Sequence, residues 1–320
     1  MSTMFIHGIE GFPATKPKSA VATIGTFDGI HRGHQAIFSR VKEYAHETGL
    51  APVLITFHPH PRTVVSPDRV PMLLTTIDEK KKFVPCFFDG IVLVMDFNQE
   101  LMNMSAEEFV QSVLIDVIGV KRLIVGYDHT LGKNREGNPE QLKKLGEKHG
   151  FEVEVVQPVI YEGEAISSSR IRKAMTAGQF QHSVDLLGHA YAIYGKVERG
   201  IGLGRKIGYP TANLRYNMRK LLPPQGVYAC YAQIKKTEWP GMMFIGQNHF
   251  NPDTGITVEA NIFDFHEDMY DQEITVYPTR FIRHNRKFDN VERLVEQIKK
   301  DKEEVLGITN EGVSGHVNRH

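Results

Sequence analysis

Two histidines set three residues apart, His31 and His34, lie in the stretch GTFDGIHRGH at 25–34. An apolar run precedes this stretch and a helical pattern follows it, so free backbone N–H groups and the positive end of a helix dipole should face outward here. Such a helix start binds anions, and glycines let a phosphate chain approach the backbone. The spacing places both imidazoles on one side of the helix. The stretch therefore predicts a nucleotide phosphate site in which both histidines donate hydrogen bonds.

The same stretch is compatible with two different roles. The loop could simply cap a helix that carries incidental histidines. Alternatively, His31 and His34 could be two ligands of a zinc site that His58 and His60 complete. The preceding strand and the glycines favour nucleotide binding over both roles.

The stretch ISSSRIR at 166–172 is a second phosphate-type pattern. Hydroxyl side chains ahead of a helix often do no more than cap it. Here two arginines, Arg170 and Arg172, follow immediately, and guanidinium groups suit the oxygens of a triphosphate. Ser168 and Ser169 would add neutral donors around them.

A third pattern, GIGLGRKIGYPTAN at 200–213, combines closely spaced glycines, two cations and a short polar pair. A flexible β-turn would explain the glycines alone. The loop also offers backbone N–H groups and cations to a triphosphate, and the oxygens of Thr211 and Asn213 are hard ligands suited to Mg²⁺. The residues expected at this nucleotide are Gly202, Gly204, Arg205, Lys206 and Thr211.

The acid that could accept a proton from an alcohol is Glu259, in TVEANIFDF at 257–265. Strand alternation places Glu259, Asn261 and Phe263 on one face. An isolated acid on a strand is commonly just solvated. A neighbouring amide is also compatible with a general base.

These residues need two kinds of scaffold. The first half alternates short apolar strands with helical patterns, which is typical of a parallel α/β sheet. The expected strands are 21–26, 52–57, 91–95, 122–125 and 152–156, and the expected helices are 31–48, 105–118 and 139–149. Ser105 and Glu108 form a capping-box pattern at the second helix.

From Leu187 onward, the alternation of strand and helix patterns gives way to β segments that are separated by glycine and proline. Helical periodicity returns only near 291–298. The expected strands are 191–197, 226–234, 242–245, 257–263 and 273–277. A compact β-barrel with a C-terminal helix is predicted. A length of 320 residues fits two domains, which we place at 1–185 and 186–320.

The composition of the chain argues against several classes of protein. Lys+Arg 38 against Asp+Glu 38 gives a net charge of +0, which argues against nonspecific nucleic-acid binding. The 2 cysteines are far apart, so neither a disulfide framework nor a CxxC-type zinc site is expected. A reducing cytoplasm is predicted. No stretch suggests an export signal or a membrane span.

GTFDGIHRGH together with ISSSRIR resembles the HxGH nucleotidylyltransferase superfamily, and TFHPHP, LLTTIDEK and VGYDHTLG narrow the resemblance to prokaryotic FAD synthetase. The resemblance implies a Rossmann-like domain that transfers AMP from ATP to FMN with Mg²⁺, forming FAD and pyrophosphate. It places His31 and His34 at the ATP phosphates and Asp128 on the flavin side. The remaining ATP contacts it implies are Gly25, Phe27, Ser168, Ser169 and Arg170.

The second half resembles the riboflavin kinase module of the same family, from LLGHAYAIYGKV through GYPTAN and VEANIFDF to FDNVERLVEQIKKD. This implies a Greek-key barrel that transfers the ATP γ-phosphate to riboflavin, forming FMN. Thr211 and Asn213 would lie at the metal, and Glu259 would act as general base. The implied partners are riboflavin, FMN and ATP, with no nucleic acid or membrane, on a monomer or transient homo-oligomer.

The chain departs from the family patterns in three loops. It reads DHTLG at 128–132 where DFxFG is common, QNHF at 247–250 where NxPTF is usual, and Asn285 in place of an acid. Two alternatives follow. The protein could retain only one of the two activities, or it could be a flavin-binding regulatory protein without turnover.

Overall fold

The computed structural model describes residues 3–12, 19–200, 202–247 and 255–310. Its contacts divide the chain into two compact units. The first contains Met1–Met72 and Lys80–Ser168, and the second contains Leu73–Glu79 and Ser169–His320. Each unit is described by itself.

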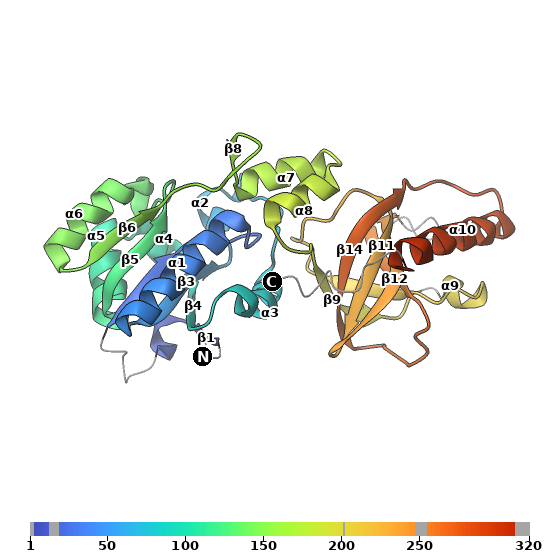
Figure 1. Ribbon diagram of the computed structural model, residues 1–320, viewed down its shortest axis with the longest axis horizontal. Coiled ribbons are helices and arrows are strands. Elements are labelled where there is room, and N and C mark those ends of the chain that lie inside the picture. The colour runs from blue at the N-terminus through green and yellow to red at the C-terminus, as the bar shows by residue number, and fades with distance from the viewer. Residues whose placement is uncertain (1–2, 13–18, 201, 248–254, 311–320) are drawn as a thin grey trace. The chain divides into compact units, whose positions relative to one another are not determined.

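The first unit is built on a six-stranded sheet in the order β1-β4-β3-β2-β5-β6 (Figure 1). Every neighbouring pair in it is parallel. The strands are β1 Met4–His7, β2 Ala20–Ile24, β3 Ala51–His58, β4 Ile91–Asp96, β5 Val120–Gly126 and β6 Glu152–Val156. The parallel α/β architecture predicted for the first half is confirmed. Strand β1 is an addition that the sequence pattern does not predict.

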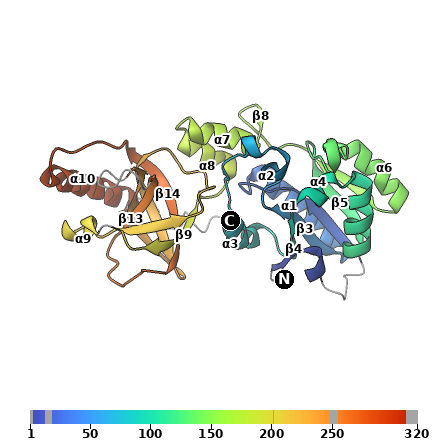
Figure 2. The same cartoon turned by 180° about the vertical axis from the view of Figure 1, so that it is seen from behind.

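Helices cover both faces of this sheet, as both views show (Figure 2). Helix α1, Arg32–Thr48, packs on β2, β3 and β5 and ends at Gly49 in the left-handed conformation (φ 72). The opposite face packs against α5, the π-helix that continues it, and α6. The helices along this part of the chain are α2 Arg62–Val65, α3 Ile77–Phe87, α4 Gln99–Asn103, α5 Ala106–Phe109, the π-helix Val110–Ile118 and α6 Pro139–His149.

Short elements complete the unit. They are the 3-10 turns Ile9–Gly11, Pro67–Arg69 and Lys133–Arg135, and the hairpin of β7 Ile160–Tyr161 with β8 Glu164–Ala165. The predicted capping box is present: Ser105 accepts from the backbone of Glu108, and the Glu108 carboxylate accepts from the backbone of Ser105.

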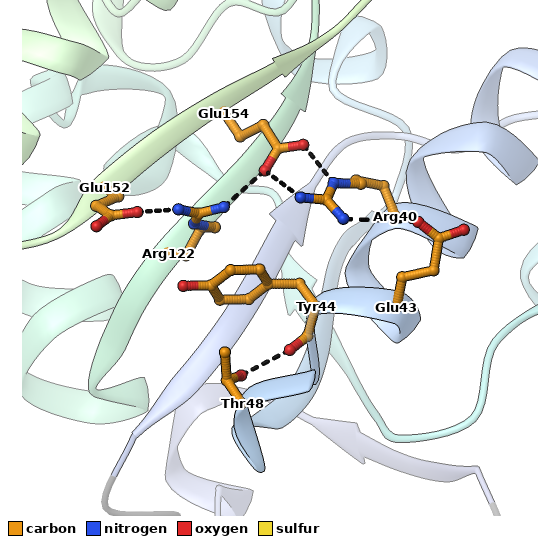
Figure 3. A network of polar contacts seen from close by, with 7 residues as sticks. All are labelled: Arg40, Glu43, Tyr44, Thr48, Arg122, Glu152 and Glu154. Carbon is orange, nitrogen blue, oxygen red and sulfur yellow. Dashed lines mark hydrogen bonds and ion pairs between the residues drawn. The ribbon is translucent and has the colours of Figure 1, made fainter. Parts of the chain in front are cut away.

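A polar network joins α1 to strands β5 and β6 (Figure 3). Arg40 and Arg122 both donate to the Glu154 carboxylate, with Nε of Arg40 at 2.5 Å and Nη1 of Arg122 at 2.9 Å. The Arg122 guanidinium lies 3.9 Å from the ring centroid of Tyr44 and also pairs with Glu152. These contacts fix the later turns of α1 on the sheet, so its first turn is carried on a rigid element.

The second unit is a closed antiparallel barrel in the order β10-β13-β12-β11-β14-β9. The strands are β9 Ile193–Glu198, β10 Ala212–Tyr216, β11 Gly226–Ile234, β12 Thr237–Gln247, β13 Ile256–Ile262 and β14 Glu273–Arg283. Strand β14 lies beside β11 and not beside β13, which is the Greek-key arrangement. The predicted barrel is confirmed. Strand β10 forms where the sequence pattern predicts a loop, and it pairs with both β9 and β13.

The helices described in the second unit are α7 Ser168–Thr176, whose first residue still belongs to the first unit, α8 Phe180–Leu187, α9 Leu203–Lys206 and α10 Val291–Asn310. The predicted terminal helix is α10. Asp301 of α10 is 2% exposed and accepts from Arg283 at the end of β14, at 2.8 Å from Nη2. Val305 packs with Phe263 and Ala229. A charge-assisted pair and an apolar contact thus hold α10 on the barrel.

The segment 73–79 is part of the second unit although it lies in the first half of the sequence. Leu73 exchanges backbone hydrogen bonds with Arg219 and Leu221, both at 2.7 Å. Glu79 forms a buried ion pair with Lys220, with 2.9 Å between Oε2 and Nζ. The segment is therefore fastened to the barrel by both backbone and charge.

Candidate active sites

The chain reverses its direction across the parallel sheet between β2 and β5, because β3 and β4 lie on one side of β2 and β5 and β6 on the other. Crevices at the carboxyl ends of strands beside such a reversal are where open α/β sheets bind ligands. The loop after β2 carries GTFDGIH, and the loop after β5 carries Asp128. The topology therefore brings the predicted nucleotide loop and the predicted flavin loop to the same edge of the sheet.

The histidine pair occupies the start of α1. His31 is the N-cap, and no side-chain cap bond is formed there. The rings of His31 and His34 stack with 3.5 Å between centroids and an interplanar angle of 21°. His31 is 5% exposed and His34 is half-buried. The Phe27 ring meets His34 edge-on at 5.3 Å. Packing therefore holds both imidazoles at a helix start that can receive an anion.

The glycines in this loop leave room for rings. A Cβ on Gly25 would lie 3.0 Å from the Phe27 ring, and a Cβ on Gly33 would lie 3.2 Å from the His31 ring. Phe27 itself is 3% exposed. Phe27 therefore packs beneath the loop in this structure.

The serine-arginine segment begins α7. The Ser168 hydroxyl donates to the backbone carbonyl of Asp28 at 2.7 Å, which brings this segment to the nucleotide loop as predicted from sequence. Ser169 and Arg170 follow in the same first turn, where Ser169 is exposed and Arg170 is half-buried. The division between the two units falls between Ser168 and Ser169.

The loop after β5 holds Asp128 exposed within a turn that the His129 N–H closes by donating to the Gly126 carbonyl at 3.1 Å. Burial lowers the pKa of His129 to about 4, so this imidazole is neutral near pH 7. The side-chain atom Nε2 of His129 is buried and has no hydrogen-bond partner among the described residues. The departure from the family pattern at this position thus places a neutral ring beside Asp128.

The zinc alternative finds no support. In the described part of the chain, no three His, Cys, Asp or Glu side chains are grouped so that they could hold a metal ion.

The second candidate site lies on the barrel. Asn213 of β10 stands directly opposite Glu259 of β13 in the strand register. The Thr211 hydroxyl donates to Oε2 of Glu259 at 3.2 Å, and the Thr257 hydroxyl lies 3.5 Å from Oε1. The strand pairing therefore brings together three of the residues predicted for this site: Thr211, Asn213 and Glu259.

Two forces act on the Glu259 carboxyl. Burial raises its pKa above the usual range, and the hydrogen bonds from Thr211 and Thr257 partly offset that rise. Asn261, on the same face, is 6% exposed and donates to the Pro210 carbonyl at 2.6 Å. This amide holds the GYPTAN segment against β13, a contact that the sequence pattern alone did not specify.

In the glycine-rich loop that precedes β10, two glycines lie in close contact with other parts of the chain. A Cβ on Gly204 would lie 2.3 Å from the Tyr209 carbonyl oxygen, and a Cβ on Gly200 would lie 2.4 Å from the Asn213 amide. Gly202 has φ 74 and is exposed. The glycines therefore let the loop fold back over Asn213 and Tyr209.

The two cations of this loop, Arg205 and Lys206, are exposed at the end of α9. Arg205 reaches the Tyr270 hydroxyl at 3.4 Å, and Arg199 lies 4.9 Å from the Tyr270 ring centroid. Tyr270 is a contact of this loop that the sequence analysis missed, since it lies more than fifty positions away in the chain.

One departure from the family pattern has a clear structural role. Asn285 donates to the Ile245 carbonyl at 3.0 Å and packs on Gly246. In the altered stretch 247–250, Gln247 ends β12, and the remaining three positions lie outside the described residues.

Another residue missed by the sequence analysis is Lys80, whose ammonium donates to the Thr26 carbonyl in the nucleotide loop. Val84 and Phe88 follow it at intervals of four residues and are both buried. That helical spacing was a signal that Lys80 lies on the buried side of α3.

None of the helices in the described ranges combines the length and the apolar character that crossing a membrane requires. The model of the family described as FAD synthetase matches residues 14–170, and that of riboflavin kinase matches residues 187–309. A crystal structure from Streptococcus pneumoniae, described as a macrolide-efflux protein, is similar with a TM-score of 0.83 at 31% identity, covering 96% of this chain and 99% of that one.

Relatives named bifunctional riboflavin kinase/FMN adenylyltransferase match nearly the full length. The Pseudomonas fluorescens protein is 37% identical, covering 92% of this chain and 94% of its own. The proteins of Listeria monocytogenes and Bacillus subtilis are each 34% identical, covering 95% and 96% of this chain and 97% and 98% of their own. Both halves match in the same order, so this chain belongs to the bifunctional riboflavin kinase/FMN adenylyltransferase family.

Proposed function

We propose that the two activities of the family are divided between the two sites described above. The chain is an enzyme of both kinds: it phosphorylates riboflavin to FMN with ATP and adenylylates FMN to FAD with release of pyrophosphate. The observation that carries the division is the pair of unlike phosphate-type sites, one with stacked histidines at a helix start and one with a carboxylate at its centre.

Adenylyl transfer takes place at the first of these. The nucleophile is an FMN phosphate oxygen that is already ionised near neutral pH, so the reaction needs positioning and charge neutralisation more than a protein base. His31 and His34 donate to the ATP phosphates as charge moves to the leaving pyrophosphate. The remaining contacts of this proposed site are Gly25, Ser168, Ser169 and Arg170 for ATP, and Asp128 for the flavin. Phe27 belongs to the same ATP site, where its buried ring supports His34 from beneath the loop.

Phosphotransfer to riboflavin takes place at the second site. The riboflavin hydroxyl is a weak nucleophile, and Glu259 accepts its proton during attack. Gly202, Gly204, Arg205 and Lys206 surround the triphosphate with backbone donors and positive charge.

Mg²⁺ fits this second site. The hydroxyl of Thr211 and the amide oxygen of Asn213 are hard ligands, and they stand beside a carboxylate. When bound, the ion would neutralise charge on the phosphates. Thr211 also orients Glu259 by its hydrogen bond, which keeps the carboxylate aimed while the proton moves.

We place the functional boundary at 185/186, with adenylyl transfer in 1–185 and phosphotransfer in 186–320. The family matches, which end at 170 and begin at 187, support this placement. Fragments 186–320 and 169–320 should both phosphorylate riboflavin with reduced stability, because both lack Glu79, the buried partner of Lys220. The longer one should be the more stable of the two because it keeps the contact of Phe180 with Tyr228. A folded but inactive 186–320 fragment would move the boundary.

The proposed partners are the small molecules riboflavin, FMN and ATP, without nucleic acid or membrane. A net charge of +0 supports the first exclusion. The free cysteines Cys86 and Cys230 agree with a cytoplasmic location. The chain would act as a monomer or transient homo-oligomer, which light scattering across a concentration series tests.

One incubation tests the function. Purified protein receives riboflavin, ATP and Mg²⁺, and the flavins are separated by chromatography over time. FMN should form first and FAD should follow, and a chelator should stop both steps. A parallel reaction that starts from FMN isolates the second step. A preparation that makes only one product would leave just one of the two proposed sites active.

A further inference from the structure

Lys80 is a buried cation that no step described above uses. It lies on α3 with 7% of its surface exposed, and its Nζ donates to the backbone carbonyl of Thr26 at 2.5 Å. Lys81, the next residue, is exposed. Burial of an ammonium group is costly unless partners compensate it.

The partners of this ammonium belong to the nucleotide loop. Burial lowers the pKa of Lys80 to about 8, and the Asp28 carboxylate opposes that shift by favouring the charged form. Asp28 is 1% exposed and lies two residues after Thr26. The charge of Lys80 is therefore compensated by the segment that leads into the histidine pair.

This segment holds a backbone that would not persist by itself. Phe27 and Ile30 both have φ 45, in the left-handed region that side chains with a Cβ rarely adopt. Such a conformation is least favourable for a β-branched residue like Ile30. Strained positions of this kind persist only when surrounding contacts hold them, and they gather at functional sites.

Side chains from outside the loop supply such contacts. The Thr56 hydroxyl donates to the Thr26 carbonyl at 3.3 Å, the Ser168 hydroxyl donates to the Asp28 carbonyl at 2.7 Å, and the Gln35 amide donates to the Ile30 carbonyl at 2.8 Å. Lys80 supplies the shortest of these four bonds and the only one of them that carries a charge. Charge-assisted bonds are the stronger kind.

We propose that Lys80 is a positioning residue for adenylyl transfer: its ammonium fixes the 26–30 turn and thereby the place of His31 and His34. The inference rests on the proposed assignment of these histidines to the adenylyl site. Lys80 acts through the loop and is not required to touch the substrate.

The experiment compares K80M with K81M, which removes the neighbouring exposed ammonium. For FMN adenylylation, K80M should lower kcat about 100-fold, because misplacing reacting groups by about an ångström costs that much. KM for FMN and for ATP should stay within about threefold, since the groups that bind them remain. K81M should match the wild type in every constant. Riboflavin phosphorylation by both variants should be unchanged.

A second variant separates positioning from folding. K80A leaves space for a small amine, and added ethylamine should raise its FAD formation at least about tenfold, while K81A shows no response. A K80M kcat within about threefold of wild type would overturn the proposal. So would a folded K80A that ethylamine does not rescue, or loss of the first unit's fold in either variant, which would make Lys80 a folding residue.

The site assignment has its own control. If H34A retains normal FAD formation, the proposed adenylyl site itself is wrong, whatever K80M does. If H34A loses FAD formation and K80M does not, the site stands and only the role of Lys80 falls.

Discussion

The residues of the two phosphate-type sites are held in place by different kinds of structure. In the first unit, the groups lie on a tight loop between a buried strand and a helix, and Phe27, Asp28 and His31 are 3%, 1% and 5% exposed. In the second, Glu259 and Asn213 sit opposite each other on barrel strands, while Arg205 and Lys206 are exposed. The first site depends on contacts that hold a strained turn, and the second depends on strand register.

Under the proposed assignment of one step to each site, this difference suits the chemistry of the two steps. An ionised phosphate nucleophile needs donors set around a migrating charge, and a helix start with packed imidazoles supplies them. An alcohol nucleophile needs a base at a definite place, and a strand holds a carboxylate at a definite place. Variants in one site should therefore leave the other reaction intact, and the variants below test that independence.

The largest effect is expected for Glu259→Gln. An amide cannot accept the riboflavin proton, so FMN formation should fall about 1000-fold, within the range for loss of a general base. Conversion of supplied FMN to FAD should stay normal. The two rates are measured separately by chromatography, with the exposed Glu267→Gln as the matched control. Near-normal FMN formation would mean that another residue is the base or that none is needed.

Lys220→Met should destabilise the barrel that carries the second site, although Lys220 is not one of the proposed site residues. Lys220 and Glu79 are 2% and 1% exposed, and the variant leaves the Glu79 carboxylate buried without its cation. We expect a loss of about 3 kcal/mol in the free energy of unfolding.

Trp239, the single tryptophan, lies on β12 and reports unfolding of the barrel in urea by its fluorescence. The exposed Lys236→Met is the control, with a change under about 0.5 kcal/mol. The double variant Lys220→Met with Glu79→Gln should be more stable than Lys220→Met alone, because the uncompensated charge is gone. Equal stability of the two would show that the ion pair is not the cause.

His34→Ala tests the first site and should show the reverse of Glu259→Gln, with FAD formation reduced and FMN formation retained. Loss of one oriented donor should lower FAD formation about 100-fold. FMN formation should stay within about twofold of wild type. His46→Ala, an exposed histidine on the same helix, should change neither rate. Equal loss of both activities would remove the histidines from a dedicated adenylyl site.

The smallest expected effect is a difference in pH dependence. A general base works ionised, and burial raises the pKa of Glu259, so FMN formation should decline with acidity at a higher pH than an ordinary glutamate would produce. The decline approaches about tenfold per pH unit below that pKa. Glu259→Gln should lack this acid limb in its residual activity. If FAD formation declined with acidity over the same pH range, the decline would not be due to protonation of Glu259.

Much of the local structure could be predicted from short-range patterns. The helix over 31–48 ends at Gly49 because a left-handed residue closes it, and the Ser105 capping box forms as its spacing indicates. The change along the chain from alternating strands and helices to successive β segments predicted two different folds, and both are present. Strand β10 could not be predicted in this way, because its partners β9 and β13 come from separate segments of the chain.

Residue types and spacing by themselves determined the phosphate-type chemistry, the order of the two folds and most of the elements. Only the tertiary structure decided that 73–79 joins the barrel, that Lys80 and not Lys81 is buried, and that Thr211, Thr257 and Asn261 surround Glu259 and the GYPTAN segment. The reason is physical: helix caps, turns and periodicity depend on neighbours within a few residues, whereas burial of a charge and the register of two strands depend on groups brought together from distant parts of the chain.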